Sequence, residues 1–214
     1  MAASDPTPPS SPLRLLFARH GATAPNLAGL RCGGDLDPPL VEEGRRQAIE
    51  LARHVAARRP RIELILCSDL LRVRETAAIV RAALGPMVLH VLPGWRERYL
   101  GGWNRRPIAE TQDELAAGVT PPGGESVAEF RARIERTLLD AAPLLRRQAL
   151  LVGSKGVGRV LRELAGLPPQ PPLRNAELMA LSFDHLRQAE EPAPVPGPTQ
   201  PQSLLQPLPT GANA

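Results

Sequence analysis

The sequence predicts an α/β fold, a three-layer sandwich with a mainly parallel central sheet and helices on both faces. Five short apolar runs have the length and composition of buried strands. Segments with helical periodicity separate most of these runs, and strands that are joined through helices are usually parallel. The 214 residues, of which 43% are hydrophobic, are enough for one full core. We therefore expect a single folded domain.

The predicted strands and helices alternate along the chain. The strands are residues 13–18, 62–66, 87–92, 149–153 and 178–183. The apolar stripes of three helices are Val41, Ala48, Leu51 and Val55; Leu70, Val73, Ala77, Val80 and Leu84; and Val127, Phe130, Ile134, Leu138, Ala141 and Leu145. The third helix also has a start signal, because Ser126 and Glu129 have the spacing of a capping box. The predicted order is β-α-β-α-β-α-β-α-β.

Proline-rich segments at both ends set the expected limits of this domain. Residues 1–12 and 188–214 are too polar and too rich in proline to bury a core, so we expect two disordered tails around a domain at 13–187. As a polyproline II helix, the C-terminal tail can dock in an aromatic groove of a protein partner, or it can serve only as a linker.

Composition limits the classes of partner. No segment resembles a signal peptide or approaches the roughly 20 apolar residues of a membrane helix, so we expect a cytoplasmic protein without a membrane partner. Cys32 and Cys67 lack metal-ligand spacing and are expected to be reduced thiols. The net charge of +4 admits nucleic acid, but the arginines are dispersed and aromatic residues make up only 3% of the chain. An anionic small molecule is the favoured ligand, with a solvated basic surface as the alternative.

Three predicted strands end in residues that can carry chemistry. The first is followed by Arg19, His20 and Gly21, the second by Ser68 and Arg72, and the fourth by Ser154, Lys155 and Gly156. Ligands of such sheets bind beyond the carboxyl ends of the strands, where helix N-termini attract anions. Guanidinium groups grip phosphoryl oxygens, and imidazole can attack phosphorus. The pattern therefore predicts a site for a phosphoryl group.

The motifs around these positions resemble those of the histidine phosphatase superfamily, the phosphoglycerate-mutase-like enzymes. They are FARHGATAPNLAG (17–29), GGDLDPPLVEEGRRQA (33–48), CSDLLRVRETA (67–77), WRERYLGGWNRR (95–106) and PPGGES (121–126). Together with the flanking strands they extend over residues 13–183 in the family's order. No alternative nucleotide site is expected, because neither a P-loop nor a dinucleotide loop has the spacing of LLVGSKGVGRVL (150–161).

The resemblance implies a role for each matching residue. His20 is the expected nucleophile and becomes phosphohistidine, while Arg19 and Arg72 hold the phosphoryl oxygens. Glu97 is the expected general acid, which protonates the leaving oxygen and then deprotonates water. Gly21, Thr23, Asn26 and Gly156 match phosphate- or substrate-binding positions, with a turn or cap role as the alternative for Thr23 and Asn26. The implied chemistry uses no metal ion and no cofactor.

Lys155 departs from the family pattern, which has a second histidine at this strand end. Lys155 is expected to be catalytic, because its positive charge can replace the histidine in stabilising the phosphoryl oxygens during transfer. A lysine fixes its donor less well than imidazole does, however, and it could pair with Glu97 and spoil it as an acid. Of the other histidines, His54, His90 and His185 are not obvious replacements. Two functions stay open. One is hydrolysis of a phosphorylated small metabolite; the other is a catalytically weak or inactive relative that binds a phosphorylated ligand or a protein partner.

The short connection between Trp103 and Pro122 favours a phosphatase over a mutase. The family's mutases carry longer insertions that close over the intermediate, whereas water should reach a phosphohistidine here. Overall length and the quoted segments resemble the small phosphatases of the family, among them the alpha-ribazole phosphatases. A homodimer is compatible with the sequence but is not predicted by any motif.

Overall fold

The structure, a computed structural model, describes residues 13–183 and contains the predicted mainly parallel sheet. The strands are β1 (Leu13–Arg19), β2 (Leu64–Cys67), β3 (Val88–Val91), β4 (Ala149–Gly153) and β5 (Leu178–Phe183). They lie in the order β3-β2-β4-β1-β5, and only β5 is antiparallel to its neighbour. The predicted tails at 1–12 and 188–214, and residues 184–187 of the predicted domain, lie outside the described residues.

Each strand lies within two residues of its predicted limits. The largest shift is in β2, which was predicted at 62–66 and begins at Leu64. Its neighbour explains the shift, because Leu64 pairs with Ala149, the first residue of β4. At the other end, Cys67 pairs with Val152 and extends the strand by one residue.

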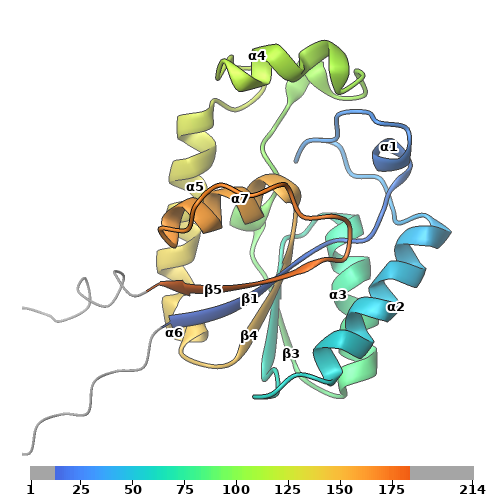
Figure 1. Ribbon diagram of the computed structural model, residues 1–214, viewed down its shortest axis with the longest axis vertical. Helices are drawn as coiled ribbons and strands as arrows, with labels where there is room; N and C mark the ends of the chain where they lie inside the picture. Colours follow the sequence, from blue (N-terminus) through green and yellow to red (C-terminus); the bar gives the residue numbers. More distant parts are fainter. Residues whose placement is uncertain (1–12, 184–214) are drawn as a thin grey trace, which may run out of the picture.

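Helices cover both faces of the sheet, as the sequence predicts. Figure 1 shows α2 (Glu42–Ala56) and α3 (Leu71–Leu84) on one face. The other face carries α5 (Val127–Asp140), α6 (Ala142–Leu145) and α7 (Lys155–Leu164). The predicted capping box of α5 is present: the Glu129 backbone N–H donates to Ser126 Oγ (3.1 Å), and the Ser126 N–H donates to Glu129 Oε2 (2.8 Å). The three-layer architecture is confirmed.

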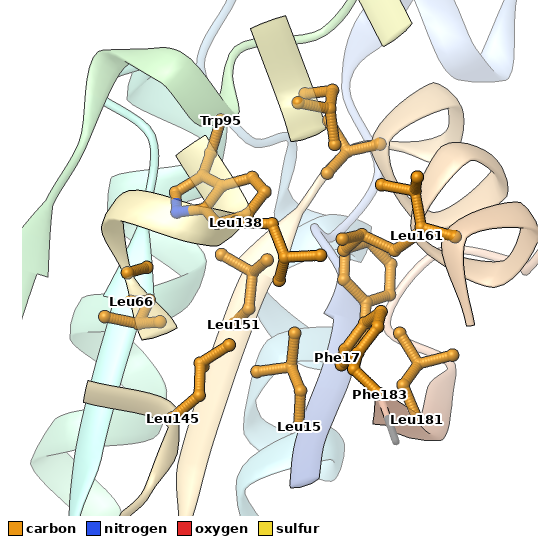
Figure 2. Close-up of a cluster of buried hydrophobic side chains, with 14 of the residues drawn as sticks. Leu15, Phe17, Leu66, Trp95, Leu138, Leu145, Leu151, Leu161, Leu181 and Phe183 are labelled. Atoms are coloured by element: carbon orange, nitrogen blue, oxygen red, sulfur yellow. The ribbon is translucent and has the colours of Figure 1, made fainter. Parts of the chain in front are cut away.

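Two apolar layers follow from the alternation of side chains along the strands. In β1, Leu15 and Phe17 belong to the core under α5, α6 and α7, which Figure 2 shows, whereas Leu16 and Ala18 belong to the core under α2 and α3. Fully burying one such leucine or phenylalanine side chain stabilises the fold by about 1.5–3 kcal/mol. The two layers hold the carboxyl ends of β1, β2 and β4 in fixed positions.

A glycine lets α7 approach β1 closely. A Cβ at Gly158 would lie 2.7 Å from a ring carbon of Phe17, so a larger residue would push the helix away from the strand. The contact fixes the N-terminus of α7, which begins at Lys155, beside the end of β1.

The connections at the carboxyl end of the sheet contain short helices that the sequence did not predict. They are α1 (Ala24–Leu27), α4 (Gln112–Ala116) and the 3₁₀ turns η1 (Pro93–Trp95), η2 (Gly101–Trp103) and η3 (Ala109–Thr111). Figure 1 shows α1 and α4 beyond that end of the sheet. Between residues 13 and 183, every helix is too short or too polar to cross a membrane.

Candidate active site

His20 follows directly after β1 and faces a cavity at the carboxyl end of the sheet. Its backbone N–H donates to the carbonyl of Gly153 at the end of β4 (2.9 Å), so the two strand ends fix the position of the residue. The side chain is 4% exposed. Its Nδ1 lies 2.7 Å from the Gly21 carbonyl oxygen, which can only accept, so Nδ1 carries the proton. The lone pair is therefore on Nε2.

The surroundings of His20 keep its imidazole neutral. Burial, together with the guanidinium groups of Arg72 and Arg19, holds the pKa of His20 well below its ordinary value of 6.5, against a smaller opposing effect of the Gly21 carbonyl. A neutral imidazole with a free Nε2 lone pair is the nucleophilic form of histidine. The side chain is thus in the form that can act as a nucleophile at neutral pH.

Arg19 and Arg72 line the same cavity as His20. Arg72, in the first turn of α3, is 1% exposed and donates through Nη1 to Leu36 O (2.7 Å) and through Nη2 to Gly33 O (3.1 Å). Arg19 Nη1 donates to Leu173 O (2.8 Å). Backbone carbonyls orient both groups, yet the buried Nε atom of each has no hydrogen-bond partner among residues 13–183.

Two buried hydroxyl groups near the strand ends also lack partners. Ser68 follows β2, and Ser154 is the N-cap residue of α7 and lines the cavity. Neither Oγ atom makes a hydrogen bond within the described part of the chain. Buried polar atoms are normally paired. Unpaired donors beside two guanidinium groups and a helix N-terminus are what a bound anion would satisfy.

Glu97 lies in the turn between η1 and η2 and is anchored through its carboxylate. Its Oε2 accepts a hydrogen bond from the Gly156 backbone N–H (2.7 Å), and its Oε1 accepts one from the Arg98 N–H (2.8 Å). The neighbouring guanidinium groups are engaged elsewhere: Arg96 pairs with Asp69 (2.7 Å), and Arg98 Nε donates to Glu125 O (2.7 Å). Glu97 lines the cavity. Within residues 13–183, its carboxylate has no ion-pair partner closer than 4 Å.

Lys155 is the first residue of α7, and its exposed side chain lines the cavity. Its ammonium group makes no hydrogen bond or ion pair with residues 13–183, so the pairing with Glu97 that the sequence left open is not formed. Partial burial and the nearby Arg19 lower the pKa of Lys155, with Glu97 opposing them and Arg31 and Arg159 adding to them. Lys155 therefore adds to the cavity wall a cation that has no partner within the described residues.

The cavity has a volume of about 380 Å³ and brings together most of the residues that the sequence predicts. The lining residues among them are Arg19, His20, Asn26, Arg72, Glu97, Lys155 and Gly156. Gly21 and Thr23 are not in the lining. The Gly21 N–H donates to Thr76 Oγ1 (3.1 Å), and the Thr23 hydroxyl donates to Asn26 Oδ1 (3.0 Å). These two residues hold the loop after β1 in shape.

The sequence places Ser154 at the end of the fourth predicted strand but predicts no role for it in the site. It does not predict several charged lining residues, among them Arg31 and Arg98. Arg31 and Arg98 carry no comparable signal, because dispersed arginines are usually solvated and these two are 8% and 3% exposed. Within residues 13–183, no group of three or more His, Cys, Asp or Glu side chains is arranged to hold a metal ion.

Known proteins that are similar to this chain are named as phosphatases and mutases. The adenosylcobalamin/alpha-ribazole phosphatase of Salmonella typhimurium is 36% identical over 141 residues, which is 60% of this chain and 68% of that protein. A Yersinia enterocolitica protein named "Probable phosphoglycerate mutase" is 33% identical over 191 residues, or 80% of this chain and 85% of its own length.

Solved structures that are similar to this chain are also named as phosphatases. The crystal structure of the alpha-ribazole phosphatase from Shigella flexneri superimposes with a TM-score of 0.66 at 27% identity, covering 78% of this chain and 89% of that one. A mycobacterial glucosyl-3-phosphoglycerate phosphatase in complex with VO3 gives a TM-score of 0.65 at 30% identity. The superposition covers 78% of this chain and 90% of that chain.

The family model of the histidine phosphatase superfamily (branch 1) matches residues 15–191, which includes β1 from Leu15, the other four strands and each cavity residue described above. Sequence, fold and site thus agree, and the chain belongs to the histidine phosphatase superfamily.

Proposed function

We propose that the protein hydrolyses phosphomonoesters of small metabolites through a phosphohistidine at His20. One observation carries this proposal: the buried, neutral imidazole has its Nε2 lone pair free, between two guanidinium groups that line the same cavity. Arg19 and Arg72 keep unpaired Nε–H groups that can donate hydrogen bonds to the oxygens of a phosphoryl group.

In the first step, Nε2 of His20 attacks phosphorus and the bond from phosphorus to the ester oxygen breaks. The leaving oxygen takes a proton from Glu97, because an alkoxide is too basic to depart unprotonated. Each carboxylate oxygen of Glu97 accepts one backbone hydrogen bond, which leaves lone pairs free for that proton. The products are the alcohol and phospho-His20.

In the second step, water attacks phosphorus and gives a proton back to Glu97. The bond from phosphorus to Nε2 breaks, so inorganic phosphate leaves and the neutral imidazole returns. The connection between Trp103 and Pro122 contains only η3 and the five-residue helix α4, which supports access of water rather than retention of the phosphoryl group for a mutase reaction. No step needs a metal ion or a cofactor.

Lys155 supplies positive charge as the phosphoryl group is transferred. It begins α7 beside the unpaired hydroxyl of Ser154, and its ammonium group is free within the described residues. A preorganised cation at developing negative charge lowers the barrier of such a reaction. The relatives named as phosphatases support hydrolysis, and the VO3 complex of one structural neighbour supports a site for a phosphoryl-like anion.

The alternative is a relative that binds phosphorylated ligands without turning them over, and Lys155 is the observation that favours it. Hydrolysis of phenyl phosphate separates the two functions. The proposal expects turnover by the wild type and none by His20→Ala, with vanadate as a competitive inhibitor of the wild type. Binding of vanadate without any turnover would establish the alternative.

A further inference from the structure

The walls of the cavity hold more positive charge than one phosphoryl group needs. Among the described residues that line it, seven are arginine or lysine and two are glutamate. Arg19 and Arg72 suffice to hold a phosphoryl dianion. The remaining cations are Arg31, Arg98, Lys155, Arg159 and Arg162.

Two of these cations are buried and have no acidic partner. Arg31 is 8% exposed and Arg98 is 3% exposed, and neither has a carboxylate within 4 Å in residues 13–183. Arg31 donates to Thr111 Oγ1 (2.7 Å), and Arg98 to the carbonyl of Glu125, so neutral groups orient both. Arg98 Nη1 is buried and makes no hydrogen bond within the described chain. Burying a guanidinium group without a counter-charge is unfavourable, and a bound anion would remove that cost.

The surplus cations lie close enough to act on one another. Burial lowers the pKa of Arg31. Burial and then Arg159 lower the pKa of Arg98, and Glu125 and Glu97 offset part of this effect. Lys155 is influenced by Arg31 and Arg159 as well as by Arg19. Lys155 therefore stands between the phosphoryl site and a second group of like charges, whose mutual repulsion an anion would relieve.

The acidic residues of the cavity neutralise only part of this charge: two glutamates face seven cations, and Glu97 raises the pKa of Lys155 and Arg98. Glu97 is anchored by two backbone N–H groups at the phosphoryl end. Glu163 is shared, at 3.1 Å from Arg131 and 3.8 Å from Arg159. Apolar side chains, among them Leu30, Ile108, Leu115 and Leu167, form the rest of the wall and suit a carbon skeleton between two charged ends.

We propose that Arg31, Arg98 and Arg159, with Lys155 at the junction, form a second anion subsite, so that the substrate is a phosphomonoester with a further carboxylate or phosphoryl group. This inference rests on the proposed hydrolase activity and names its substrate class. It also gives Lys155 a role, because Arg19 of the phosphoryl site and Arg31 and Arg159 of the second group all act on its ammonium group.

Three aryl phosphates test the subsite: 4-carbamoylphenyl phosphate, 4-carboxyphenyl phosphate and 1,4-phenylene bisphosphate. The first two differ in charge but hardly in shape. We expect kcat/KM of at least one charged ester to exceed that of the carbamoyl ester by about ten- to a hundredfold, the range of one charge-assisted hydrogen bond. The better of the two charged esters identifies the second group as carboxylate or phosphoryl.

Substitutions of single arginines test which residues cause the preference for the charged ester. Arg31→Gln and Arg159→Gln should each reduce the preference for the charged ester, and Arg159, which is exposed, keeps the test valid if Arg31→Gln does not fold. Arg131→Gln is the matched control, because Arg131 pairs with the same Glu163 but does not line the cavity. It should leave the preference unchanged. Equal kcat/KM for all three esters, or an unchanged preference in Arg159→Gln, would overturn the second subsite and leave the hydrolase proposal intact.

If none of the esters is turned over, the proposed function fails, yet the subsite can still be measured. Calorimetry of the full chain with 4-carboxyphenylphosphonate and 4-carbamoylphenylphosphonate then compares the affinities of the charged and the neutral ligand. Tighter binding of the carboxylate, lost in Arg159→Gln and kept in Arg131→Gln, supports the subsite. Equal affinities contradict it.

Discussion

The carboxylate of Glu97 is bound to the first turn of α7 by a 2.7 Å hydrogen bond from the backbone N–H of Gly156. The two residues are 59 positions apart in the sequence, yet they meet so closely that a Cβ on residue 156 would lie 2.1 Å from Glu97 Oε1. The proposed acid is thus held by the helix that carries Lys155.

Gly156→Ala should displace Glu97 and lower kcat strongly. The new methyl group cannot fit beside Oε1, and a shift of about 1 Å in a catalytic group can reduce the rate on the order of a hundredfold. Gly102→Ala is the control, because the nearest atom to its Cβ would be 3.6 Å away. Steady-state kinetics of both variants, with circular dichroism to confirm folding, measure the effect. An unchanged kcat in Gly156→Ala would show that the anchored position of Glu97 does not matter.

Lys155 should contribute to the rate through its charge. Lys155→Met removes the cation, and loss of one donor at developing charge costs on the order of a hundredfold in kcat. Lys155→His restores a donor at the same place and should recover most of that loss. The comparison uses kcat with phenyl phosphate. Wild-type kcat in Lys155→Met would mean that the lysine takes no part in the reaction.

The pKa of His20 makes a prediction for titration. Because the folded state favours neutral imidazole, His20 should show no protonation at pH 6.5, the ordinary pKa of histidine, and should titrate only at lower pH. Nitrogen NMR of the ring, assigned with His20→Gln, measures this directly. The unfolded chain takes up this proton first as the pH falls through 6.5, so the contribution of His20 to stability is complete above 6.5 and decreases below it. A midpoint at or above 6.5 in the folded protein contradicts the proposed environment.

Arg133 holds the backbone that carries Glu97. Its Nη1 donates to the carbonyls of Gly94 (2.8 Å) and Arg96 (2.9 Å), and its Nη2 lies 2.6 Å from Glu125 Oε2. Arg133→Met would leave the carboxylate of Glu125, whose side chain is 10% exposed, without its ion-pair partner and, among residues 13–183, with only the Tyr99 N–H as a donor (3.3 Å). We expect a loss of about 3 kcal/mol in the free energy of unfolding by urea, as for a broken buried ion pair.

Arg136→Met is the control for this measurement, because Arg136 is exposed on the same helix. A surface change of this kind should alter the free energy of unfolding by less than about 0.5 kcal/mol. If both variants unfold at the same urea concentration, the network around Arg133 does not stabilise the Glu97 segment.

The fold could be read from the sequence because its signals are local. Apolar runs marked all five strands, and Ser126 with Glu129 marked the start of α5. The arrangement of parallel strands then predicts that Arg19, His20 and Lys155 lie at one edge of the sheet.

The features that the sequence did not predict depend on contacts between distant segments. The bond from Gly156 to Glu97 and the burial of Arg31 against Thr111 join residues 59 and 80 positions apart. The short helices at 109–116 have no apolar stripe, and their position follows from Arg31, which donates to Thr111 and Gln112. No local pattern shows which of many arginines a cavity will enclose.

The central claim is that His20 accepts the phosphoryl group, and trapping the phosphoenzyme tests it most directly. The protein is mixed with a labelled phosphomonoester, quenched within milliseconds at alkaline pH, where phosphohistidine survives, and digested for mass spectrometry. We expect one phosphoryl group, bound to Nε2 of His20, which is absent from His20→Ala and is lost on brief exposure to acid. Turnover of the ester with no phosphoryl group on His20 at any quench time, or with the label on another residue, would contradict the claim.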